Sequence, residues 1–155
     1  MPRPALLRLH AATGALSLVM ILAFQAATLS VEAIGSPPAI AAVKQAIAWS
    51  LLVLIPALAA TGITGRSLGR GWRLPVVARK QRRMAFAAMN GLLVLAPAAL
   101  ALARLSAQGS FGPLFTAIQG TELAAGLVNV ALLGLNMKDG LALRARTSSP
   151  AAVSR

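Results

Sequence analysis

The chain has 155 residues, of which 57% are apolar and only 12% are charged, and its formal net charge is +12. Its mean hydropathy is +0.75, and a soluble core of this size cannot hide so much apolar surface from water. This composition argues against a soluble enzyme and a disordered chain, and it predicts an all-α integral membrane protein.

Four apolar stretches follow one another between charged residues, and their approximate bounds are 9–31, 39–65, 84–104 and 113–137. Each has about 20 residues or more, which is enough for a helix to cross roughly 30 Å of hydrocarbon. Short Gly/Pro breaks join the first to the second stretch and the third to the fourth. These features predict one domain over residues 1–140, a four-transmembrane-helix antiparallel bundle.

The polar segments complete this prediction. Residues 66–83 are expected to form a basic loop, and residues 141–155 a flexible basic tail. Thirteen Lys and Arg residues lie on the side that holds this loop and both termini, against Lys44 and Arg104 on the other side. The positive-inside rule therefore predicts a multi-pass protein of the bacterial inner membrane with both termini cytoplasmic.

The loop charges are also candidates for binding anionic lipid headgroups. The residues concerned are Arg66, Arg70, Arg73, Arg79, Lys80, Arg82 and Arg83. The alternative is that these charges only fix the topology. No basic surface interleaved with aromatic residues is visible, so nucleic acid is not expected as a partner.

Catalytic and metal-binding patterns are not evident. The chain has no cysteine, one histidine and three acidic residues, so thiolate chemistry and the usual metal sites lack their ligands. There is no Ser/His/Asp set and no P-loop. A non-enzymatic role is therefore the more reasonable expectation.

The fourth stretch carries a polar and small-residue face. Its members recur at steps of three and four residues: Gln119, Glu122, Gly126, Asn129, Leu133 and Asn136. The pattern predicts that this face turns either into the bundle or toward a partner. Gly120 and Ala124 form a small-xxx-small pair of the kind that lets membrane helices approach closely.

Glu122 is the only acidic residue within a predicted span, where an ionised group must be paired or protonated. The polar residues expected to share its surroundings are Gln25, Lys44, Gln119 and Asn129. We expect a Gln25–Lys44–Glu122 cluster at similar depth in the membrane. It can be read as a structural lock between helices, as a proton, quinone or ion site, or as a contact with another subunit.

A second polar set, His10, Asn90 and Asn136, is predicted near the cytoplasmic face. His10 is a candidate ligand of haem b, with Met84 or Met137 as the second ligand. The alternative is an interfacial histidine without a ligand.

Two short segments resemble known families of small bacterial membrane proteins. Leu7-Arg8-Leu9-His10 and the run Pro56–Gly62 are similar to segments of four-helix proteins of the protoporphyrinogen-oxidase and copper-resistance-D-like types. His10-Ala-Ala-Thr13-Gly14 resembles the His-Arg-x-Ser/Thr-Gly run of succinate-dehydrogenase anchor subunits, with Ala11 in place of their Arg. The resemblance implies haem b, and quinone for the anchors, although the third stretch lacks the Lys of the oxidase family.

These observations leave three functional hypotheses. The first is a non-catalytic subunit or accessory protein of a membrane complex, partnered by another membrane subunit or a second copy. The second is a haem- or quinone-associated redox component that uses His10. The third is a proton or ion pathway built on Glu122.

Overall fold

The computed structural model describes residues 2–70 and 75–147, with side chains described as far as residue 142. Its elements are, in chain order, α1 (Arg3–Ile34), α2 (Pro37–Leu68), α3 (Pro75–Asn90), η1 (Gly91–Leu95), α4 (Ala96–Ala107) and α5 (Pro113–Thr147). No strand occurs among the described residues. Four helices are long and apolar enough to cross a membrane, one of them formed by α3, η1 and α4 together. The all-helical fold with four membrane-compatible helices is thereby confirmed.

Proline marks the start of every membrane-compatible helix. Pro4 is the second residue of α1, Pro37 and Pro38 open α2, and α3 and α5 begin at Pro75 and Pro113. The first backbone N–H groups of a helix have no partner within it, so proline loses no hydrogen bond there and its fixed φ favours the helical turn.

The helices extend beyond the predicted spans. α2 continues to Leu68 and α3 begins at Pro75, so much of the segment 66–83 is helical rather than a loop. Arg, Lys, Gln and Met are good helix formers in water, and a basic segment ends a hydrophobic span without ending the helix. Likewise α5 continues to Thr147, through the first half of the expected tail. Arg73 and residues 148–155 lie outside the described residues.

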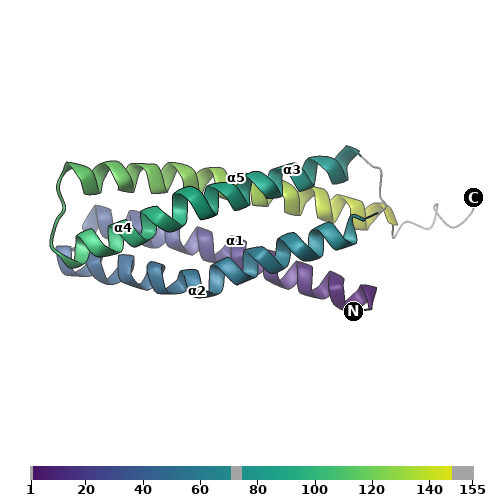
Figure 1. Cartoon of the computed structure of the whole chain (residues 1–155), viewed down its shortest axis with the longest axis horizontal. Helices are drawn as coiled ribbons and strands as arrows, with labels where there is room; N and C mark the ends of the chain where they lie inside the picture. The colour runs from purple at the N-terminus through teal and green to yellow at the C-terminus, as the bar shows by residue number, and fades with distance from the viewer. Residues whose placement is uncertain (1, 71–74, 148–155) are drawn as a thin grey trace, which may run out of the picture.

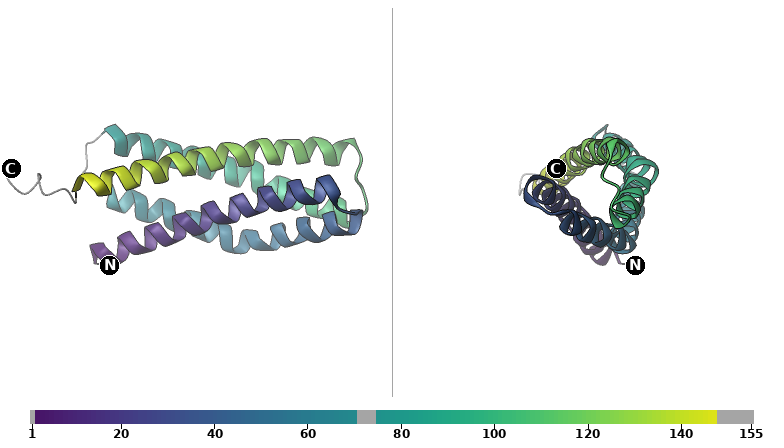
Figure 2. Two further views of the ribbon diagram at one scale, coloured as in Figure 1. Left: turned by 180° about the vertical axis from the view of Figure 1, so that it is seen from behind. Right: turned by 90° about the vertical axis from the view of Figure 1, so that its left-hand side faces the viewer.

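Figures 1 and 2 show how the helices are arranged. α1 packs against α2 and α5, while α4 packs against α2 and α5, so the end-on view in Figure 2 shows a ring of four helical columns. We call the end with residues 35–36 and 108–112 the turn end. The start of α1 and the end of α5 lie together at the opposite end, which we call the terminal end.

The hydrophobic core lies between the columns, and each column contributes to it. Its buried members are Ile21, Ile47, Leu51, Leu54, Ala87, Ala96, Ala99 and Leu133. Many large apolar side chains point outward instead, among them Trp49, Leu52 and Ile63, each at least 65% exposed. Such an outer surface suits the hydrocarbon of a membrane, because exposing large apolar side chains to water is unfavourable.

A π-helical turn, η1, interrupts the third column. The N–H of Ala96 bonds to the carbonyl of Gly91, five residues earlier. Pro97 is the next residue and has no backbone N–H. It therefore cannot make the i→i−4 hydrogen bond that would continue an α-helix. The wider turn is therefore a local response to Pro97.

The polar face of the fourth span turns into the bundle. Gln119, Glu122 and Asn129 are buried, and Asn136 is half-buried. The opposite face of α5 is exposed. Near its turn end the face carries the small residues Ala117, Gly120, Thr121 and Ala124, and large apolar side chains such as Leu127 and Leu135 follow. The polar groups thus contact the chain's own helices, and the small-residue pair remains on the outside.

Candidate functional site

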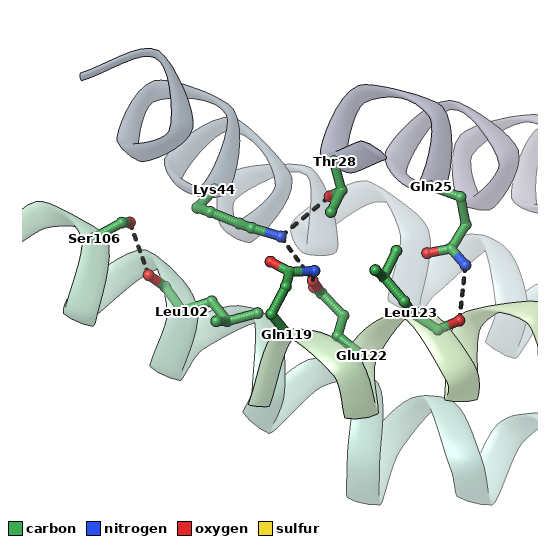
Figure 3. Close-up of polar contacts among 8 residues, drawn as sticks. All are labelled: Gln25, Thr28, Lys44, Leu102, Ser106, Gln119, Glu122 and Leu123. Carbon is green, nitrogen blue, oxygen red and sulfur yellow. Dashed lines mark hydrogen bonds and ion pairs between the residues drawn. The ribbon is translucent and has the colours of Figure 1, made fainter. Parts of the chain in front are cut away.

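A buried ion pair joins α2 to α5. The Nζ atom of Lys44 lies 2.8 Å from Oε2 of Glu122, and it also donates to the hydroxyl oxygen of Thr28 on α1 at 3.1 Å. Lys44 is 0% exposed and Glu122 is 7% exposed. Figure 3 shows the ammonium group between these two partners, so one cation connects three helices.

The three residues meet because they lie at similar depth. Thr28 precedes the end of α1 by six residues, while Lys44 and Glu122 follow the starts of α2 and α5 by seven and nine. At 1.5 Å per residue these separations correspond to about 9, 10 and 13 Å from the turn end. Burial makes this pairing necessary, since either charge alone would be costly there.

Gln119 extends the cluster along α5. Its Nε2 donates to Oε2 of Glu122 at 3.3 Å, from one helical turn nearer the turn end. The Oε1 atom of Gln119 is buried and has no hydrogen-bond partner among the described residues. The carboxylate therefore accepts from an ammonium and an amide through the same oxygen, Oε2.

Gln25 contacts the same stretch of α5 but bonds to its backbone. Its Nε2 donates to the carbonyl oxygen of Leu123 at 2.9 Å, as Figure 3 shows. A Cβ atom at position 126 would lie 2.7 Å from the amide of Gln25, so only the glycine found there allows this approach. Gln25 ties α1 to α5 beside the ion pair, and its hydrogen bond goes to the backbone rather than to Lys44 or Glu122.

Asn129 belongs to a different contact, next to η1. Its Oδ1 accepts from Nδ2 of Asn90 at 2.8 Å, and its Nδ2 donates to the carbonyl of Ala87 at 3.3 Å. Asn90 Nδ2 also donates to the carbonyl of Ala125 at 2.8 Å. This pair joins α3 to α5, so Asn90 lies with Asn129 rather than with His10, the neighbour that depth alone predicts.

His10 joins α1 to α2. Its Nδ1 lies 3.1 Å from the carbonyl oxygen of Thr61 and 3.1 Å from Oγ1 of Thr64. Because a carbonyl oxygen only accepts, Nδ1 carries the hydrogen in this arrangement. The ring lies against Gly65, where a Cβ would approach Cε1 to 2.9 Å.

The surroundings of His10 do not fit a haem as arranged. His10 lines neither the cavity beside Glu122 nor the more open one at the turn end. Met84 packs against the hydrophobic core, and Met137 is 48% exposed on α5. A cofactor of that size needs a cavity of roughly 300 Å³ or more around its ligands, whereas here the imidazole fills the space between two helices.

At the terminal end, part of the basic set is already neutralised. Asp139 accepts from Arg83 at 2.8 Å and from Arg79 at 3.4 Å. Asn136 donates from Nδ2 to the backbone carbonyl of Lys80 at 3.2 Å. Of the seven residues expected to meet lipid headgroups, two thus share a carboxylate that links α3 to α5.

Within the described residues, no group of three His, Cys, Asp or Glu side chains is placed to hold a metal ion.

Comparisons with known proteins found no match. No family model, curated protein or solved structure matches the chain.

Proposed function

We propose that this chain is a multi-pass protein of the bacterial inner membrane, an antiparallel bundle with its terminal end in the cytoplasm. The charge distribution supports this orientation, since thirteen basic residues belong to that side by sequence. On the other side, Lys44 is neutralised inside the bundle by Glu122, which leaves Arg104 as the remaining basic residue there.

We further propose that it acts as a non-catalytic subunit or accessory protein of a membrane complex. The observation that carries this proposal is the Lys44–Glu122 ion pair at 2.8 Å. It uses Glu122, the one acidic residue of the spans predicted from the sequence, to hold three helices together. The Asn90–Asn129 and His10–Thr64 contacts each join two helices elsewhere. Because the charged groups of the interior pair with each other, we assign the function to the outer surface.

The outward face of α5 is the surface we assign to the partner. Ala117, Gly120, Thr121 and Ala124 are exposed on it, and a Cβ at position 120 would meet nothing within 4 Å. Without a hydrophobic driving force in lipid, helices associate where small residues let their backbones approach. The partner is therefore another membrane helix, from a second subunit or a second copy of this chain.

Co-purification from the native membrane tests this role with two matched variants. Ala124→Leu places a bulky side chain on the exposed face of α5, and Ala59→Leu makes the same change on an exposed position of α2. We expect a stoichiometric partner or a dimer with the wild type and with Ala59→Leu, and its loss with Ala124→Leu. A monomeric wild type in mild detergent, or equal loss in both variants, would contradict the assignment.

A proton or ion pathway through Glu122 is the alternative, favoured by one observation: Glu122 lines a partly open cavity between the helices. Flux measured in proteoliposomes with Glu122→Gln separates the two functions. A pathway predicts lost flux in a variant of unchanged stability. The structural role predicts a destabilised variant and no flux in the wild type.

Anionic phospholipid is the further partner we propose, at the terminal end. Arg66, Arg70 and Arg82 are exposed there, and basic side chains at the cytoplasmic surface each gain about 1 kcal/mol from anionic headgroups. Thermal unfolding in nanodiscs of phosphatidylglycerol or of phosphatidylcholine tests this, with greater stability expected in the former. Equal stability in both lipids would refute it.

A further inference from the structure

A partly open cavity lies between the helices, on the terminal side of the ion pair. Its volume is about 40 Å³, measured as the space open to the centre of a water molecule. Most of its wall is formed by apolar side chains of α1, α2 and the η1–α4 segment. Gln25, Thr28 and Glu122 supply the polar part of the wall. Figure 3 shows Thr28 and Glu122 at Lys44, with Gln25 farther along α1.

These three side chains each keep one hydrogen-bonding group without a partner among the described residues. Both hydrogen bonds of the Glu122 carboxylate fall on Oε2, which leaves Oε1. Gln25 bonds through Nε2, which leaves its Oε1. Thr28 accepts from Lys44, which leaves its hydroxyl hydrogen. The polar wall of the cavity therefore offers two acceptors and one donor.

We propose that this cavity is a binding site for water, held by Glu122, Gln25 and Thr28. A single water molecule can donate to both Oε1 atoms and accept from the Thr28 hydroxyl, which matches the unused groups in number and kind. A buried water needs two to four polar partners and roughly 10–15 Å³ of such space. The volume of about 40 Å³ meets this requirement and has room for a second molecule.

The charge balance of the site favours water over a small cation. A cation such as Na⁺ also favours carboxylate, amide and hydroxyl oxygens. The single charge of Glu122 is already balanced by Lys44 at 2.8 Å, so a second cation would bring an uncompensated charge into a site whose wall is mostly apolar. A neutral ligand that both donates and accepts avoids this cost.

The water site adds a further link between α1 and α5, beside the Gln25–Leu123 bond, and does not depend on the proposed subunit role. Hydrogen bonds to water are nearly as favourable in enthalpy as direct ones, so a water molecule here would reinforce the direct Gln25–Leu123 bond between the two helices. It also leaves the carboxylate of Glu122 fully hydrogen-bonded, which a buried charge requires.

Water-selective nuclear Overhauser spectroscopy of the protein in nanodiscs tests the site. We expect cross-peaks between water and the side-chain amide protons of Gln25 in the wild type. Ala99→Val directs two extra methyl groups into the cavity, because Ala99 lines it, and should abolish these cross-peaks. Ala98→Val makes the same change at a neighbouring buried position outside the cavity wall and should preserve them.

Three results would overturn the assignment. The first is the absence of water cross-peaks to Gln25 in the wild type, a measurement that needs no variant to fold. The second is an equal loss of cross-peaks in both alanine variants. The third is a saturable rise of the melting temperature with NaCl that choline chloride does not reproduce, which would assign the cavity to a cation instead.

Discussion

The Lys44–Glu122 pair can be dissected with a double-mutant cycle of three variants. Lys44→Met keeps an unbranched chain of similar length and removes the ammonium, while Glu122→Gln keeps the shape of the carboxyl group and removes its charge. The third variant combines both changes. Because Lys44 is 0% exposed and has only the neutral hydroxyl of Thr28 as its second partner among the described residues, each single variant leaves a buried charge without a counter-ion.

Removing one partner of a buried ion pair typically costs about 3–5 kcal/mol, whereas replacing both partners by neutral groups is often nearly neutral or stabilising. We therefore expect each single variant to lose about 3–5 kcal/mol of unfolding free energy, which is roughly two to three and a half powers of ten in the equilibrium constant. The double variant should lose much less than either single variant, because it leaves no uncompensated charge in the bundle.

The assay is titration with SDS in mixed micelles, followed by energy transfer between dyes on two introduced cysteines. The chain has no cysteine of its own, so the labels are specific. The coupling free energy comes from comparing the double variant with the two single ones. Losses below about 1 kcal/mol in both single variants, or losses that add in the double variant, would refute the interpretation of this pair as a lock.

Three further results are expected from the contacts described. Gly126→Ala should cost about 1–3 kcal/mol by overpacking against Gln25, while Gly120→Ala, which has open space around it, should cost nothing or gain up to about 1 kcal/mol; the same SDS titration compares them. Asp139→Asn removes two partly exposed ion pairs, with Arg83 and Arg79. It should lower the free energy of unfolding by about 1 kcal/mol or less, and 0.5 M salt should diminish this loss. Protein purified after expression with haem supply should show no Soret band. A band that corresponds to one haem per chain would contradict the conclusion that the surroundings of His10 do not fit a haem.

Much of the ion-pair site could be predicted from the sequence, because depth in a membrane helix is found by counting residues. Lys44 and Glu122 follow the starts of their helices by seven and nine residues, and burial makes their pairing nearly obligatory. The role of Gln25 was less accessible. Whether it bonds to a side chain or to the carbonyl of Leu123 depends on how closely α1 approaches Gly126, and that distance is not encoded in either helix alone.

Other contacts could not be predicted, since they depend on which helices are neighbours and on local irregularities. His10 lies 51 residues from Thr61 in sequence, and nothing in its own segment identifies that partner. Depth alone groups Asn90 with His10, but Asn90 immediately precedes the π-turn Gly91–Leu95. One extra residue in a helical turn rotates the remainder of the helix by about 100°. A regular 3.6-residue period therefore assigns residues before and after this turn to the wrong faces of the helix.

The charges in the membrane, on this view of the molecule, neutralise each other within one chain. Solid-state NMR can measure that contact in lipid bilayers, with ¹⁵N at lysine Nζ and ¹³C at the glutamate carboxyl carbon. The chain has only three lysines and two glutamates, and Glu122→Gln identifies the signal. We predict a strong Nζ–carboxyl dipolar coupling in the wild type, matching direct contact of Lys44 with Glu122, that disappears in the variant. A wild-type coupling no stronger than that of Glu122→Gln would contradict the central claim that this pair forms inside the bundle.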